Sequence, residues 1–220
     1  MKSPKDPLHD YILSLSSVDK PSVLFLPTAS GGELSYIEDF YETYTPDRCV
    51  PSHLNLFYRK ELDLRSYILK NDIIRVGGGN TANMIAVWKL HGVDKILREA
   101  WEMGKILCGG SAGAICWFEG GLTDSFGDSR LAPLTGCLGF LKGSVCPHYD
   151  VDELRKPAYH DFLLAGQLPA GYAADDQVAL HFEDETLKLA VTSRSGAKAY
   201  QVSLNGEAIK ETPIEPILLS

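Results

Sequence analysis

Two short apolar segments in the middle of the sequence each run directly into a glycine-rich turn. Residues 73–76 precede Gly-Gly-Gly-Asn-Thr at 77–81, and residues 106–108 precede Gly-Gly-Ser-Ala-Gly at 109–113. A helical pattern follows each turn. Strand, glycine turn and helix in repeated succession are typical of a largely parallel sheet covered by helices. We therefore expect an α/β protein, with its 220 residues in one domain, 1–220.

Other apolar segments extend this pattern along the chain. Pro46 and Gly92 are expected to end helices, and Asp94 to cap one. Between residues 121 and 177 the pattern predicts loops rich in Gly, Asp and Pro. The last three strands lie close together with turn residues between them, so hairpin or mixed pairing is expected there. The expected strands are 23–26, 53–57, 178–182, 187–191 and 199–202, and the expected helices are 36–44, 82–90, 94–103 and 112–118.

Composition and charge exclude several classes of function. The formal net charge of −8 disfavours a surface that neutralises nucleic-acid phosphates. The first residues lack the apolar core of a signal peptide, and no stretch approaches the roughly 20 apolar residues of a membrane helix, so a cytoplasmic protein is expected. The five cysteines show no C-x-x-C spacing, which disfavours a disulfide framework or a zinc site and predicts small buried residues instead.

The turn at residues 109–113 has the features of a nucleophile turn. A catalytic hydroxyl must project toward the substrate while nearby main-chain N–H groups stay free for the oxyanion, and a tight strand-to-helix turn with small residues provides both. Ser111 is therefore the candidate nucleophile. The alternative is that Ser111 only caps the helix starting at Ala112. Cys108, inside the strand, and Cys116, a turn along the helix, are the weaker candidates.

The turn at residues 77–82 also fits G-x-G-x-x-A, which could bind a phosphate at a helix N-terminus. Dinucleotide binding would also need an acidic residue about 20 residues later, at the end of the next strand. Asp94 and Glu99 are near that distance but lie in a predicted helix. The other interpretation is that this turn lies beside the Ser111 turn and gives a backbone N–H to an oxyanion hole.

Three motifs together resemble the peptidase E family, which includes the cyanophycinases. They are Val-Gly-Gly-Gly-Asn-Thr at 76–81, Gly-Ser-Ala-Gly-Ala at 110–114 and Cys-Pro-His-Tyr at 146–149, in a resemblance running from about residue 23 to about 202. It implies a three-layer α/β sandwich with a mostly parallel central sheet, similar to class I glutamine amidotransferases and flavodoxin-like. It also implies a serine peptidase; peptidase E itself removes an N-terminal aspartate from dipeptides.

The resemblance assigns roles to particular residues. Ser111 is expected to be the nucleophile and His148 the general base, with the N–H groups of Gly79 and Ala112 as the oxyanion hole. Asn80, in the same motif as Gly79, is expected to contact substrate. The position of His148 after an apolar segment, at a predicted strand end, agrees independently with this assignment.

The third triad member is expected to be a carboxylate. Family members have Glu in a late segment, where this sequence has Asp176, whose side chain is shorter by one methylene. Asp176 is the first candidate and Asp124 the second, with a structural turn as the alternative for each. A substrate carboxylate would need a cation such as Arg155, which could equally be a solvated helix residue.

The expected function is hydrolysis of small peptides through an acyl-enzyme, without metal or organic cofactor. The expected partner is a small peptide substrate, with neither nucleic acid nor membrane, and a homodimer is common among such enzymes. Two alternatives stay open: a catalytically silent relative acting as an interaction protein, and an α/β domain that binds a nucleotide or phosphate at residues 77–79.

Overall fold

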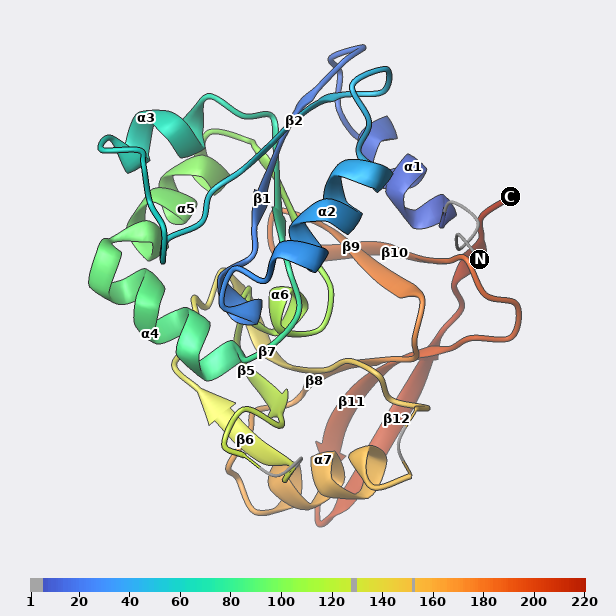
Figure 1. The fold of residues 1–220 in the computed structure, drawn as a ribbon. Helices are drawn as coiled ribbons and strands as arrows, with labels where there is room; N and C mark the ends of the chain where they lie inside the picture. Colours follow the sequence, from blue (N-terminus) through green and yellow to red (C-terminus); the bar gives the residue numbers. More distant parts are fainter. Residues whose placement is uncertain (1–5, 128–129, 152) are drawn as a thin grey trace. The chain divides into compact units, whose positions relative to one another are not determined.

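A computed structural model describes residues 6–127, 130–151 and 153–220 (Figure 1). By their internal contacts, these residues form two compact units. Unit 1 contains residues 9–113, and unit 2 contains residues 6–8 and 114–220. The single domain expected over residues 1–220 stays a prediction.

The sheet of unit 1 is entirely parallel. It contains β1 (Ser22–Leu26), β2 (Val50–His53), β3 (Ile73–Val76) and β4 (Ile106–Gly109) in the order β2-β1-β3-β4. This is the strand order of flavodoxin-like, doubly wound sheets, whose ligands bind at the carboxyl ends of the strands. The register pairs Val76 with Gly109, so the two glycine turns begin side by side at the carboxyl ends of β3 and β4.

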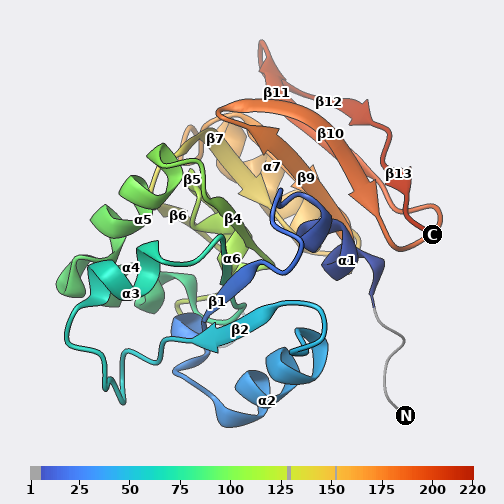
Figure 2. The same cartoon turned by 90° about the horizontal axis from the view of Figure 1, so that it is seen from above.

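Helices cover both faces of this sheet, so unit 1 has three layers. Figures 1 and 2 show α2 (Leu34–Thr43) on one side of β1, and α3 (Leu64–Leu69), α4 (Thr81–His91) and α5 (Val93–Glu102) on the other. On the α2 side, a core of β-strand and helix residues is completed by Ile12 and Leu13 of α1 (Pro7–Ser14). The β1 residues 23–26 are fully buried, as expected of a strand covered on both faces.

Unit 2 contains two sheets and one longer helix, α7 (Arg155–Leu164). The six-stranded sheet has the order β12-β11-β8-β7-β5-β6, parallel from β5 through β7 to β8 and antiparallel at both edges. The three-stranded sheet has the order β13-β10-β9. Their strands are β5 (Phe118–Thr123), β6 (Ala132–Thr135), β7 (Leu141–Cys146), β8 (Gly171–Ala174), β9 (Val178–Glu183), β10 (Thr186–Thr192), β11 (Ala199–Asn205), β12 (Ala208–Ile214) and β13 (Ile217–Leu218).

The predicted fold class is confirmed, as are most predicted elements of unit 1. The strands at 23–26, 73–76 and 106–108 and the helices at 36–44 and 82–90 are present, as are the three late strands, with β9 and β10 antiparallel. The predicted strand 53–57 is wrong, because β2 ends at His53. The carboxamide oxygen of Asn55 then accepts hydrogen bonds from the N–H groups of Phe57 and Tyr58, which turns the chain.

Three further predictions are corrected by the observed backbone structure. Gly92, with φ of +71°, ends α4 and also begins α5, so Asp94 lies within the first turn instead of capping it. The helix predicted for 112–118 is the single turn α6 (Ala112–Ile115), because Phe118 pairs with Leu141 in the sheet. Residues 121–177, predicted as loops, also contain α7 and the strands from β6 to β8.

A buried hydrogen bond between α4 and the turn after β1 gives a first prediction. Trp88 is fully buried, and its indole Nε1 donates to Thr28 Oγ1 at 3.1 Å. Thr28→Val removes the acceptor and should lower the free energy of unfolding by about 1–3 kcal/mol, because the indole N–H would stay buried without a partner. Urea denaturation measures the change. Thr28→Ser, which keeps the hydroxyl, is the control and should lose less; equal stability of Thr28→Val and the native protein would contradict this account.

Candidate active site

Ser111 lies in a strained turn between β4 and α6. Its φ is +55°, in the left-handed region that non-glycine residues seldom occupy. The turn is closed by a 2.9 Å hydrogen bond from Gly113 N–H to the Gly110 carbonyl. The sequence predicted this turn correctly. Its strained backbone is what a nucleophile turn requires and is more than a helix cap needs.

Close backbone contacts explain the glycines on either side of the serine. A Cβ at Gly113 would lie 2.4 Å from the Val76 carbonyl oxygen, at the end of β3. A Cβ at Gly109 would lie 2.4 Å from the carbonyl oxygen of Gly113 itself. Only glycine permits this approach, so the Ser111 turn is fixed directly against the neighbouring strand.

The second glycine turn lies beside Ser111. A Cβ at Gly78 would lie 3.4 Å from the Ser111 Cβ. The N–H of Gly78 donates to the Tyr36 hydroxyl at 3.1 Å, and the N–H of Asn80 donates to the Ala29 carbonyl at 2.8 Å. Between them, Gly79 has φ of +130°, and a Cβ there would lie 2.3 Å from the same Ala29 oxygen.

The two main-chain donors predicted for the oxyanion hole both lie in unit 1. Within the described residues, no hydrogen bond uses the Gly79 N–H. Ala112 is the first residue of α6, so its N–H has no acceptor inside the helix. Their roles toward an oxyanion stay predictions.

Asn80 has a structural role that the sequence analysis did not assign. Its side-chain oxygen accepts a hydrogen bond from Asn83 N–H at 2.8 Å and so caps α4. This cap occupies the helix N-terminus where a phosphate would otherwise bind, which weakens the nucleotide interpretation. The expected contact of Asn80 with substrate stays a prediction.

His148 and Asp176 form a hydrogen-bonded pair in unit 2. They follow the adjacent parallel strands β7 and β8, whose carboxyl ends bring them together. His148 Nδ1 bonds to Asp176 Oδ1. When Nδ1 carries the proton and donates it in this hydrogen bond, Nε2 carries none and can accept a proton from a substrate or nucleophile. A general base needs this tautomer of the imidazole. His148 has φ of +58°, and a 3.0 Å bond from Tyr149 N–H to the Ala174 carbonyl holds the two loops together.

Asp124, the second candidate carboxylate, contacts Arg155 and not His148. Arg155 Nη2 lies 3.3 Å from Asp124 Oδ2, and Nη1 donates to the Pro147 carbonyl at 3.4 Å. The Arg155 side chain is only 12% exposed, so it is not the solvated helix residue weighed above. Its charge is already offset by Asp124. The catalytic role of Asp124 and the substrate role of Arg155 stay predictions.

The cysteines are poorly suited to be nucleophiles. Burial raises the pKa of Cys108 to about 11, although Arg75 acts in the opposite direction, and burial raises that of Cys146 to about 12. Burial also raises the pKa of Cys116 well above its usual value. These thiols therefore carry little thiolate near neutral pH. Across the described residues, all five cysteines are free, and no group of three His, Cys, Asp or Glu side chains could hold a metal ion.

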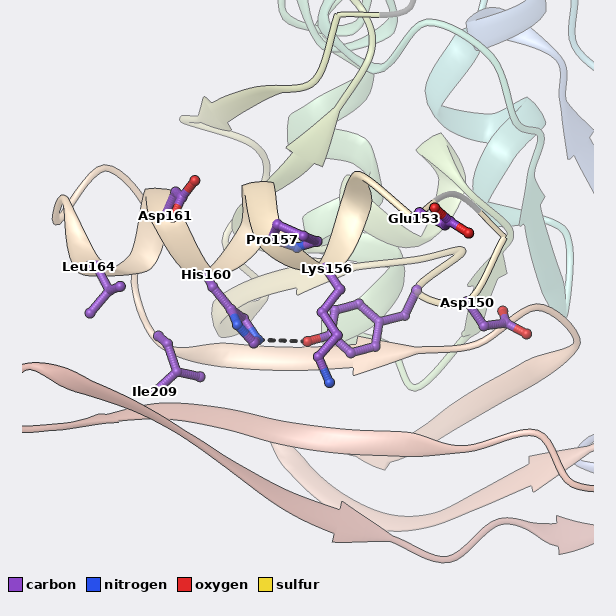
Figure 3. A pocket seen from close by; sticks show the side chains of 9 residues that line it. Asp150, Glu153, Lys156, Pro157, His160, Asp161, Leu164 and Ile209 are labelled. Carbon is purple, nitrogen blue, oxygen red and sulfur yellow. Dashed lines mark hydrogen bonds between the residues drawn. The ribbon is translucent and has the colours of Figure 1, made fainter.

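Sequence reasoning did not find the pocket beside α7, which has a volume of about 640 Å³. Figure 3 shows the side chains that line it. The hydroxyl of Tyr149 bonds to His160 Nε2 at 2.8 Å and to Glu211, and Lys156 Nζ binds Glu211 at 2.7 Å. None of the predicted site residues lines this pocket. Its lining residues are Tyr149, Asp150, Glu153, Lys156, Pro157, His160, Asp161, Leu164 and Ile209.

Sequence reasoning also missed the groups that surround Asp176. Asp150 Oδ1 accepts a hydrogen bond from Asp176 N–H, and Arg194 Nε donates to the Asp176 carbonyl. Asp150 is only two residues after His148, which is a signal that could have suggested it. Arg194 carries no such signal, because it is brought here by pairing of β9 with β10.

Comparison with known proteins identifies relatives of this chain. The family model described as peptidase family S51 matches residues 1–190. The chain is 51% identical over 209 residues to the uncharacterized peptidase YgaJ of Bacillus subtilis, covering 94% of this chain and 89% of that protein.

Among the described residues, no helix has the length and apolar character needed to cross a bilayer.

Two solved structures share the fold at low sequence identity. A crystal structure assigned to peptidase E of Listeria monocytogenes has a TM-score of 0.54 and 18% identity, covering 94% of this chain and 93% of that one. A peptidase from an acI-B1 actinobacterium has a TM-score of 0.62 and 17% identity, covering 96% and 88% respectively. At this identity the two structures show the fold alone, and they agree with the predicted α/β class.

The contacts of Gly79 give a second prediction. Gly79→Ala should lower the free energy of unfolding by about 1–3 kcal/mol or more, because it adds both backbone strain and a clash with the Ala29 carbonyl. Gly104→Ala is the matched control: φ is also positive, at +76°, but the added Cβ would meet nothing within 4 Å. Chemical denaturation measures the free energy of unfolding of both variants. The difference between their losses separates the effect of the clash from that of the backbone strain. A loss no greater for Gly79→Ala than for Gly104→Ala would contradict the described close approach.

Proposed function

Because this chain belongs to peptidase family S51 and is a serine-type peptidase, we propose that it hydrolyses small peptides with Ser111 as nucleophile and His148 and Asp176 completing the triad. The observation that carries the proposal is the bond from His148 Nδ1 to Asp176. An imidazole held in this way by a carboxylate is ready to accept a proton on Nε2. The strained Ser111 turn, beside a second glycine turn, supports the assignment of the nucleophile.

The proposed reaction is acyl transfer in two steps. Ser111 Oγ attacks the peptide carbonyl carbon while His148 Nε2 takes the hydroxyl proton, and the N–H groups of Gly79 and Ala112 bind the resulting oxyanion. The C–N bond then breaks, and His148 gives its proton to the leaving amine. Water, deprotonated by the same imidazole, attacks the ester carbonyl carbon. The ester C–O bond then breaks, the imidazole returns the proton to Ser111 Oγ, and the acid is released. Asp176 orients the imidazole and stabilises its charged form throughout.

The substrate class proposed is a small peptide, and an N-terminal aspartate is the narrower candidate. That narrower preference would use Arg155, whose guanidinium contacts Asp124. A substrate carboxylate would have to replace Asp124 as the partner of this cation. We therefore propose that Asp124 weakens selection for acidic peptides. A cytoplasmic location and a homodimer belong to the same proposal.

Ser111→Ala tests the nucleophile. Its kcat should fall by about 10⁴-fold or more, since the members of a triad act as a unit. A fluorophosphonate probe should label the native protein once, at Ser111, and should leave Ser111→Ala unlabelled. Folding of the variant is checked by its thermal melting. Full peptide hydrolysis by Ser111→Ala would refute the assignment, and an unlabelled native protein would indicate a catalytically silent relative.

Asp124→Asn separates the two roles considered for that carboxylate. We expect hydrolysis of an Ala-X dipeptide to stay near the native rate, because His148 keeps Asp176. The KM for the matching Asp-X dipeptide should fall about tenfold, since Arg155 would regain an unpaired charge for a substrate carboxylate. Steady-state kinetics on the two dipeptides measure both effects. A collapse of kcat on both substrates would instead assign Asp124 to the triad.

A further inference from the structure

Two charged side chains in unit 2 hold the main chain of Asp176 from both sides. Asp150 Oδ1 accepts a hydrogen bond from Asp176 N–H at 2.9 Å. Arg194 Nε donates to the Asp176 carbonyl at 3.3 Å, and Arg194 Nη2 binds the other oxygen of Asp150. The three residues therefore close a ring of hydrogen bonds around one peptide segment. None of these bonds uses the Asp176 carboxylate, which remains directed to His148.

We propose that Asp150 and Arg194 are positioning residues that fix the Asp176 carboxylate against His148. This inference rests on the proposed function, in which the two residues are the acid and base of a triad. Neither Asp150 nor Arg194 is required to touch the substrate. Both would act on the rate through the orientation of the imidazole.

The loop after β8 needs such support because it is exposed and irregular. The Asp176 side chain is 43% exposed, and the next residue, Gln177, has φ of +64°. A loop of this kind has few buried contacts to restrict its motion. Thr192 Oγ1 donates to the Gln177 carbonyl at 2.8 Å and accepts from Arg194 N–H at 3.0 Å. Arg194 is thus itself held where it meets the loop.

Asp150 connects the base to the acid. It lies in the turn that begins at His148, in which Val151 N–H donates to the His148 carbonyl at 3.3 Å. Its bond to Asp176 N–H therefore sets the spacing between the turn of His148 and the loop of Asp176. Catalytic geometry is sensitive to such spacing, since a shift of about 1 Å can cost about 100-fold in rate.

Arg194 also balances the charge of this region. The carboxyl groups of Asp150 and Asp175 lie close enough for Asp150 to raise the pKa of Asp175, although burial is the larger cause, and Arg194 Nη2 lies 4.0 Å from Asp175 Oδ2. Although burial alone would raise the pKa of Asp150, bonds from Asp176 N–H and Arg194 hold it below its usual range. Without Arg194, repulsion among the carboxylates would favour movement of the loop away from His148.

The test compares Arg194→Ala, Asp150→Ala and Asp150→Asn with the native protein. The first two should lower kcat, and the rate of fluorophosphonate labelling of Ser111, by about 10–100-fold, with KM nearly unchanged. Asp150→Asn keeps an oxygen that can accept from Asp176 N–H and should lose less than Asp150→Ala. The double variant should lose less than the product of the two single losses, because both residues act on the same segment.

A matched control comes from the hairpin that precedes Arg194. Lys188 Nζ pairs with Glu183 at 3.0 Å near the opposite end of β9 and β10, and both residues are partly exposed. Lys188→Ala removes an ion pair of the same kind and should leave kcat, labelling and KM unchanged. Thermal melting of all variants checks that they remain folded.

Proton NMR tests the orientation of His148 without any substrate. The proton on His148 Nδ1, bonded to a carboxylate, should resonate at low field in the native protein. It should be lost or broadened in Arg194→Ala and Asp150→Ala and retained in Lys188→Ala; His148→Ala identifies it.

Native labelling rates and an unchanged low-field resonance in both Arg194→Ala and Asp150→Ala would overturn the positioning role. Failure of the proposed function would give a different result, because Ser111→Ala would then still hydrolyse peptides. In that case the low-field resonance would still show whether Asp150 and Arg194 orient His148.

Discussion

The contact between the Ser111 turn and the end of β3 constrains the rest of unit 1. Val76 and Gly109 pair in register, and Gly113 approaches the Val76 carbonyl so closely that a Cβ would lie 2.4 Å from it. The serine therefore takes a left-handed backbone conformation within a turn that has no room to relax. Parallel pairing places the turn of Gly79 at the same edge. Main-chain packing, more than any side chain, defines the nucleophile region.

In unit 2, parallel strand pairing and main-chain contacts also bring the candidate site residues together. The adjacent parallel strands β7 and β8 end at one level, so His148 and Asp176 meet without a long side chain on either. The shorter Asp reaches the imidazole because its loop is drawn in by main-chain bonds, including those to Asp150 and Arg194. A carboxylate at this position thus depends on backbone support for its geometry.

Helices and strands were predicted best from the sequence where a single local feature, such as a buried apolar segment or a glycine cap, determines the structure. β1 is buried on both faces and reads as a continuous apolar segment, and the helix ending at Gly92 has a left-handed cap. Prediction failed where tertiary pairing overrode local preference, as at Phe118, which joins a strand instead of extending a helix. The two glycines of β5 give it poor strand propensity, so this strand was not predicted; pairing with its neighbours β6 and β7 compensates for that propensity.

The sequence by itself determined the α/β class, the two glycine turns and the candidate Ser111, because strand periodicity and turn chemistry are local properties of the chain. The candidate His148 came from the resemblance of its motif to the peptidase E family. Only the tertiary structure decided that Asp176 contacts His148 while Asp124 pairs with Arg155. These partners are separated by 28 and 31 residues. Such contacts depend on which strands pair and at what register, and no local pattern encodes them.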